Sequence, residues 1–273
     1  MIVNEKINVK RRYVRQVRAM LYAWEKFGLK DAEKEYNEKY SMTEKAKVFE
    51  EVVRGKIGFI RHVKGPENPV FKNLAQKFNT LTTSTKIQTE PTIEEYAKLA
   101  TWIIETDTNQ GTAFFVEKFV LVTCRHCLAD KMVIFHPSEP SKKYPVKAKT
   151  IDDDRDLAIL EAPEELTKKV KPLKIAAYEK PKDGADVILM GYPNHQIWRP
   201  IRVEDGKVIR CFPNSGVQFI EVSTKIIEGN SGGPLLDGDM KVVGIAARGL
   251  NPKIDVKSAE FFAISVKELQ HLK

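Results

Sequence analysis

The chain has 273 residues, of which 42% are hydrophobic and 30% are charged, and these proportions are typical of a folded domain in water. It contains no run of about 18 apolar residues, and its first residues lack the apolar core of a signal peptide, so neither a membrane partner nor secretion is expected. The cysteines are too few, and odd in number, for a disulfide scaffold, which predicts a cytoplasmic location. They are Cys124, Cys127 and Cys211. Cys124 and Cys127 with one histidine between them do not make a zinc site, so no metal or cofactor is predicted.

The net charge of +8 is confined to the first third of the chain. Residues 1–90 contain 19 Lys and Arg against 11 Asp and Glu, whereas residues 91–273 contain 26 of each. This asymmetry favours two modules, the first of which faces a polyanion. A solvated helical face explains the same charges, and charge alone leaves both interpretations open.

The first part of the chain has helical periodicity. Five apolar residues from Val14 to Phe27 recur at spacings of three and four, and Gly28 then ends the predicted helix. Further helices are expected over 31–40, after a cap at Ser41, and from Pro69. The sequence thus predicts a helical domain at 1–80, a Thr-rich linker at 81–95 and a second domain at 96–273. A helix over 91–106 is expected to lead into the second domain.

Basic residues cluster where the first helix begins. Their spacing places Arg11, Arg15 and Arg18 on one side, away from the apolar stripe. The candidate nucleic-acid contacts are Lys10, Arg11, Arg12, Arg15 and Arg18.

The second part of the chain has β character. Short apolar or β-branched runs alternate with turn residues, including the Asp-Gly pairs at 205–206 and 237–238. The predicted strands are 114–116, 119–122, 157–160, 187–190, 219–222 and 242–245. Many short strands and few helices predict a barrel or a sandwich.

Three motifs in this part carry candidate chemistry. His126 follows the second strand of GTAFFVEKFVLVTCRHC, Asp156 opens the strand DLAIL, and Ser231 lies among the small residues of EGNSGGPLL. A serine hydroxyl needs an adjacent base, a histidine can exchange its proton near neutral pH, and a carboxylate orients the imidazole. The N–H groups of Gly229 and Ser231 are the candidate oxyanion hole. Three further aspartates, 152–154, precede Asp156, but only Asp156 directly precedes the apolar strand.

The order His, Asp, Ser and the motif T-x-x-H-C resemble the chymotrypsin-like serine proteases. The sequences GNSGGPLL and Gly191-Tyr192-Pro193 resemble the HtrA (Deg) branch in particular. The resemblance implies two antiparallel six-stranded β-barrels, endopeptidase activity and a protein or peptide substrate. It departs from the family at Cys124-Arg125, where two small residues are usual, so crowding of His126 is a possibility to test.

The same resemblance extends to specificity and activation. It places Lys225 at the base of the primary substrate pocket and Ala247 and Gly249 along its wall. A buried Lys225 ammonium favours acidic substrate residues, whereas an outward-facing one leaves a pocket for small aliphatic residues. Asn230 stands where trypsin-like zymogens have an aspartate that pairs with a new N-terminus, so activation by propeptide cleavage is not expected.

Residues 2–78 resemble the C-terminal thumb of a bacterial retron-type reverse transcriptase, in IVNEKINVKRRYVRQVRAMLYAWEKFGL, VVRGKIGFIRHVKG and NPVFKNLAQKF. The resemblance implies that residues 1–80 bind structured RNA or an RNA–DNA duplex beside a polymerase palm that is missing here. Either the gene is truncated or the chain is a fragment, and we favour a fragment. By analogy its parent is a reverse transcriptase–protease fusion in antiphage defence, and no polymerase activity is expected of the chain itself. The alternative is a catalytically passive RNA-binding scaffold.

Overall fold

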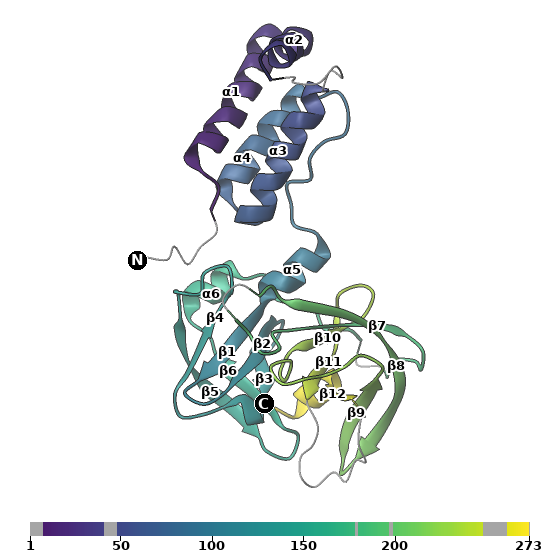
Figure 1. Cartoon of the computed structure of the whole chain (residues 1–273). Coiled ribbons are helices and arrows are strands. Elements are labelled where there is room, and N and C mark those ends of the chain that lie inside the picture. The colour runs from purple at the N-terminus through teal and green to yellow at the C-terminus, as the bar shows by residue number, and fades with distance from the viewer. Residues whose placement is uncertain (1–7, 41–47, 178–179, 197–198, 248–260, 273) are drawn as a thin grey trace. The chain divides into compact units, whose positions relative to one another are not determined.

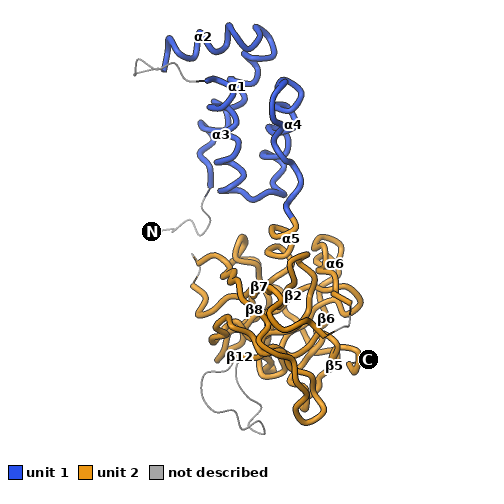
Figure 2. The backbone as a smooth tube through the Cα atoms, turned by 90° about the vertical axis from the view of Figure 1, so that its right-hand side faces the viewer, with its two compact units in different colours: residues 1–92 blue, residues 93–273 orange. Residues whose placement is uncertain are grey.

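A computed structural model describes residues 8–40, 48–177, 180–196, 199–247 and 261–272. The chain divides into two compact units, Met1–Thr92 and Ile93–Lys273 (Figure 2). No helix within these described ranges is long and apolar enough to cross a membrane.

The first unit is helical in its described part (Figure 1). Its helices are α1 (Arg11–Phe27), α2 (Leu29–Tyr40), α3 (Phe49–Lys64) and α4 (Pro69–Leu81). The apolar stripe of α1 packs inward as predicted, and Trp24 makes edge contacts with Phe49 and Phe78. Phe27, the last residue of that stripe, is exposed. Gly28 ends α1 with φ at 85°, a conformation that glycine adopts without steric cost. Ser41, the expected cap of the third helix, lies outside the described residues.

The segment predicted as a linker is partly fixed to the helical unit. The Asn79 side chain accepts a hydrogen bond from the Ile87 N–H at 2.7 Å and donates one to the Ile87 carbonyl at 2.8 Å. Thr82 and Ser84 both donate to the Glu50 carboxylate. These bonds place residues 82–88 with the first unit rather than between the two.

The second unit contains two closed six-stranded antiparallel barrels, and this confirms the predicted fold class. The first barrel has the order β1-β2-β3-β6-β5-β4 and the second has the order β10-β11-β12-β9-β8-β7. The strands of the first are β1 (Thr101–Thr106), β2 (Gln110–Val116), β3 (Val120–Cys124), β4 (Met132–Phe135), β5 (Tyr144–Asp152) and β6 (Leu157–Glu161). Those of the second are β7 (Asp186–Gly191), β8 (Arg202–Asn214), β9 (Val217–Val222), β10 (Pro234–Leu236), β11 (Val242–Ala247) and β12 (Phe261–Ser265). The short helices of this unit are α5 (Ile93–Ala100), η1 (Arg125–Cys127), α6 (Glu164–Lys169) and η2 (Val266–His271).

Two local predictions were wrong. The helix expected over 91–106 ends at Ala100, because residues 101–106 pair with both β2 and β4 as a strand that closes the first barrel. The turn expected at Asp205-Gly206 lies inside β8, where these residues pair with Ile188 and Val187. A Cβ at Gly206 would lie 2.8 Å from the Thr224 Cβ, so this glycine allows close packing rather than a turn. By contrast, Asp237-Gly238 does connect β10 to β11.

Candidate active site

His126 and Asp156 meet because β3 and β6 are paired neighbours. The pairing sets Cys124 opposite Leu157, so the residue that precedes β6 lies beside the turn that follows β3. Asp156 Oδ2 is 2.7 Å from His126 Nδ1, and Asp156 Oδ1 accepts the His126 backbone N–H at 2.9 Å. One carboxylate therefore fixes both the ring and the backbone of His126. A histidine held through Nδ1 in this way can use its opposite ring nitrogen to exchange a proton with a reactant.

Asp156 adopts a left-handed backbone conformation, with φ at 54°, that costs energy for a residue with a side chain. Its carbonyl accepts the Arg125 N–H at 3.1 Å. The preceding turn is fixed by Asp152, whose carboxylate accepts the Arg155 N–H and its guanidinium, both at 2.9 Å. Arg155 also donates to the buried Glu268 at 2.9 Å. Asp152 thus supports the turn, whereas Asp156 is the aspartate of the segment 152–156 that contacts His126.

Ser231 lies in a glycine-rich loop between β9 and β10 and is 5% exposed. Gly229 and Gly232 have φ values of 91° and 80°. A Cβ at Gly229 would lie 2.5 Å from the Tyr192 carbonyl, and one at Gly232 would lie 2.2 Å from the Thr112 carbonyl. Side chains at these two positions would therefore displace the loop. Within the described ranges the Gly229 N–H donates to no backbone carbonyl, which leaves it available to a ligand.

Comparison with known proteins agrees with this geometry. Residues 111–245 match the family model of the trypsin-like peptidase domain. This segment is a trypsin-like peptidase domain. The match includes all three residues of the candidate triad.

The relatives of the peptidase domain include HtrA-type serine proteases. A DegP-like periplasmic serine endoprotease of Pseudomonas putida is 30% identical over 161 residues, which are 57% of this chain and 31% of that protein. The serine protease HTRA1A of Danio rerio is 27% identical over 159 residues, which are 56% of this chain and 33% of that protein. The chain thus spans about a third of the length of these curated relatives. The solved structure of the HtrA-type protease AlgW with a tripeptide superimposes with a TM-score of 0.53 at 20% identity, over 66% of this chain and 62% of that one.

Cys124 and Arg125, the two residues that depart from the family pattern, do not crowd His126. The Cys124 side chain is fully buried and donates to the Ala246 carbonyl at 3.3 Å. The Arg125 side chain is exposed and pairs with Asp153. Both side chains therefore have partners of their own.

Cys124, His126 and Asp156 also offer donor atoms that lie within 4.8 Å of one another, a set that could in principle hold a metal ion. Burial raises the pKa of the Cys124 thiol well above its usual value, and the neighbouring Asp156 carboxylate raises it further. A neutral thiol is a poor metal ligand, and the His126 Nδ1 is already bonded to Asp156. The donor set fits a catalytic histidine better than a metal centre.

The electrostatics of the peptidase domain favour the protonated form of His126. Burial lowers the pKa of His126, but the hydrogen bond to Asp156 and the interaction with the Cys127 thiol together raise it to about 10. The Cys127 sulfur is buried and lies 3.6 Å from the Ser231 carbonyl.

We expect the acid limb of kcat/KM for peptide hydrolysis to lie well above pH 6.5. Because a general base must be neutral, a raised pKa keeps His126 inactive up to a higher pH, and activity rises as the pH passes through that pKa. Cys127→Ala removes one raising interaction, so its acid limb should move to lower pH. The measurement is the pH profile of kcat/KM for each protein. Cys211→Ala, whose buried thiol lies in the second barrel, should keep the wild-type profile. A wild-type limb at or below pH 6.5 would contradict this expectation.

Two of the three predicted pocket residues lie in the described part of the chain. Ala247 is buried at the end of β11, and Gly249 lies outside the described residues. Lys225 is exposed, between the buried Thr224 and Ile226. The exposed position matches the outward-facing alternative for Lys225, and the residue preference of the primary pocket stays a prediction.

Asn230 is buried, with 1% of its surface exposed, and its side-chain amide has no hydrogen-bond partner among the described residues. The expectation that no new N-terminus pairs with this position stays a prediction. Within the described ranges, the Asn230 side chain adds no hydrogen bond that would hold the loop of Ser231.

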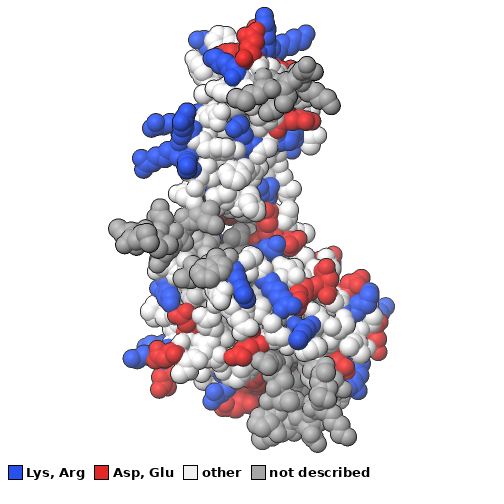
Figure 3. Space-filling view, viewed as in Figure 1, with Lys and Arg blue, Asp and Glu red and all other residues white. Residues whose placement is uncertain are grey.

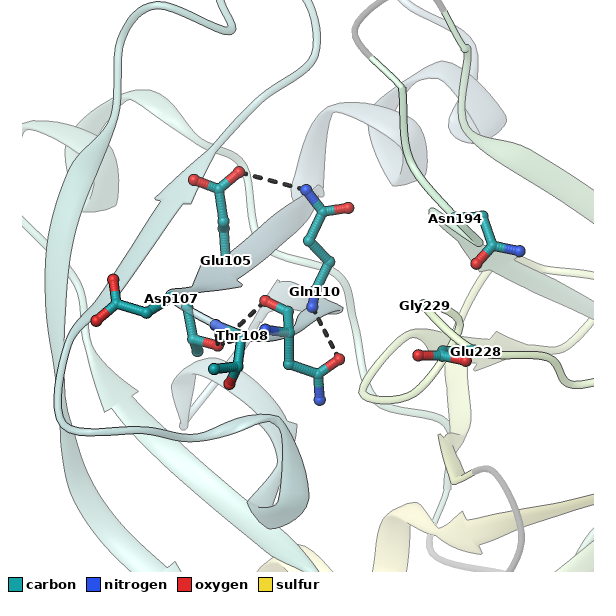
Figure 4. Close-up of a pocket in the computed structure, with 9 residues that line it drawn as sticks. Glu105, Asp107, Thr108, Gln110, Asn194, Glu228 and Gly229 are labelled. Atoms are coloured by element: carbon teal, nitrogen blue, oxygen red, sulfur yellow. Dashed lines mark hydrogen bonds between the residues drawn. The ribbon is translucent and has the colours of Figure 1, made fainter.

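A polar pocket of about 370 Å³ adjoins Gly229 (Figure 4). Residues 105–110 of the β1–β2 hairpin form one side, and Asn194, Glu228 and Gly229 form the other. Glu105 is already bonded to Gln110 at 3.3 Å and to Lys143. Sequence reasoning missed this surface because its two sides are far apart along the chain.

The predicted basic residues lie in the first unit, and all five are exposed. They are Lys10, Arg11, Arg12, Arg15 and Arg18. Figure 3 shows Lys and Arg side chains gathered on the α1 face of that unit. Among the described residues none of the five forms a salt bridge, and the first turn of α1 has neither an acidic residue nor a side-chain cap.

Proposed function

We propose that this chain is a serine endopeptidase that hydrolyses peptide bonds through an acyl-enzyme on Ser231. The observation that supports this proposal most directly is that Asp156 contacts both the ring and the backbone N–H of His126. The same peptidase domain has Ser231 two residues after Gly229. HtrA-type relatives support a protein or peptide as the substrate.

In this proposal His126 accepts the Ser231 hydroxyl proton as the oxygen attacks the scissile carbonyl. Asp156 holds the imidazole by Nδ1 and stabilises its positive charge. The N–H groups of Gly229 and Ser231 bind the oxyanion, an effect worth roughly 3–4 kcal/mol for one donor in comparable sites. His126 then returns the proton to the leaving amine, and water releases the acyl group by the reverse steps.

The experiment is covalent labelling with a fluorophosphonate, which reacts with activated serines. We expect the intact chain to be labelled, and peptide mapping by mass spectrometry to place the label on Ser231. A label that maps to another serine, or no label on the folded protein, would refute the proposal.

We further propose that the helical unit binds structured RNA or an RNA–DNA duplex through α1. Cations at a helix N-terminus interact unfavourably with the helix dipole, and here no acidic residue in the first turn offsets Lys10, Arg11 and Arg12. An anionic partner would offset this cost. The resemblance to a retron-type thumb suggests a polymerase palm as a partner, a cytoplasmic location and a role in antiphage defence.

We expect the full chain to bind a hairpin RNA with an affinity that falls steeply with salt. Each phosphate-contacting arginine should add roughly 0.7–0.9 to the slope of log affinity against log salt concentration. Arg15→Glu should lower both affinity and slope, whereas Lys34→Glu, which makes the same charge change at an exposed position of α2, should not. A titration series from low to high salt measures both. If Arg15→Glu behaves like Lys34→Glu, α1 is only a solvated helix.

A further inference from the structure

Thr112 is a fully buried residue of β2 whose hydroxyl and N–H bond to segments near Ser231, while its carbonyl accepts the hydroxyl of Thr123 in β3 at 2.7 Å. Its hydroxyl donates to the Gly229 carbonyl at 2.6 Å and accepts the Tyr192 N–H at 3.1 Å. Its own N–H donates to the Ser231 carbonyl at 2.9 Å. One residue of the first barrel thus contacts both residues of the candidate oxyanion hole.

The loop needs such an external support. Gly229 has no side chain, so both of its backbone torsions are free until something else fixes them. The next residue, Asn230, contributes no side-chain hydrogen bond among the described residues. The Thr112 hydroxyl supplies the bond to the Gly229 carbonyl, and the Asn230 N–H of the same peptide donates to the Ile227 carbonyl at 2.9 Å. These two bonds together fix the plane of the Gly229–Asn230 peptide.

We propose that Thr112 is a positioning residue for the oxyanion hole. Its hydroxyl anchors the Gly229 carbonyl, and this limits rotation about the two backbone torsions of that glycine. The Gly229 N–H, which lies in the preceding peptide, then keeps its direction toward the oxygen that gains charge in the transition state. The inference rests on the proposed serine-protease function, which it deepens. Because the bond does not involve His126 or Asp156, its loss should weaken oxyanion stabilisation and leave the titration of His126 unchanged.

The test is Thr112→Val in the full chain, because valine keeps the shape of threonine and lacks the hydroxyl. We expect kcat for a peptide substrate and the rate of fluorophosphonate labelling to fall by roughly tenfold to a hundredfold, somewhat less than the loss of a whole donor. KM should stay within about threefold, and the acid limb of the pH profile should not move. Thr112→Ser, which keeps the hydroxyl, should restore most of the rate.

The matched control is Thr101→Val. Thr101 is also fully buried, and its hydroxyl donates to the Ala97 carbonyl at 2.8 Å, away from the nucleophile loop. Thermal unfolding of each variant separates lost stability from lost rate. A Thr112→Val protein that is less stable but reacts at the wild-type rate would overturn the inference, as would an equal loss of rate in Thr101→Val.

Two further comparisons separate the role of Thr112 from the serine-protease proposal on which it rests. If Thr112→Val does not fold, Thr112→Ser and Thr112→Ala differ only in the hydroxyl, and equal labelling rates in that pair would overturn the inference. If the wild-type chain itself is not labelled, the serine-protease proposal fails. If the wild type is labelled and Thr112→Val matches it, only the role of Thr112 fails.

Discussion

Ser231→Ala should lower kcat for peptide hydrolysis by about 10⁴- to 10⁶-fold with little change in KM, because the nucleophile is lost while substrate contacts remain. His126→Ala should have a similar effect. Since the two residues act as a unit, the double variant should be about as slow as either single variant. Steady-state kinetics with a fluorogenic peptide gives all three values.

Ser223→Ala is the control, because Ser223 is exposed and its hydroxyl only accepts the Lys207 N–H. Its kcat should stay at the wild-type value. If Ser231→Ala retains more than about a tenth of wild-type activity, Ser231 is not the nucleophile. If neither protein cleaves any peptide or protein offered, the passive scaffold becomes the better account of the peptidase domain.

Arg155→Met should lower the free energy of unfolding by about 3 kcal/mol, because it leaves the buried Glu268 carboxylate without its cation. Glu268 is 5% exposed at its side chain and would keep one bond, from the Gln218 N–H at 3.1 Å. The double variant Arg155→Met/Glu268→Gln should recover part of the loss, since the glutamine carries no charge. Urea unfolding measures the free energy for each protein.

Arg125→Met is the matched control for this ion pair. Arg125 pairs with Asp153 at the surface, where the side chains are 44% and 73% exposed. An exposed pair contributes little, so this variant should stay within about 1 kcal/mol of wild type. If Arg155→Met is no less stable than Arg125→Met, the pair with Glu268 does not stabilise the fold.

Local sequence signals were sufficient for the helices of the first unit and for half of the strands. The period of three to four residues predicted α1, and short apolar runs predicted β2, β3, β6, β7, β9 and β11 but not the other six strands. The failures at 101–106 and at Asp205-Gly206 have a common cause. Pairing partners far along the chain make these segments strands, and neither the apolar run nor the Asp-Gly pair contains those partners.

The sequence by itself determined the candidate His126, Asp156 and Ser231, because the chemistry restricts the residue types and the flanking strands and glycines restrict their surroundings. Only the tertiary structure identified Thr112, Arg155 and Glu268 as supports of that site. Thr112 is 117 residues from Gly229, and Arg155 is 113 residues from Glu268. A threonine in a strand or a glutamate near a C-terminus has no local pattern that reveals such a partner. Barrel closure brings these groups together, and burial then makes each hydrogen bond costly to lose.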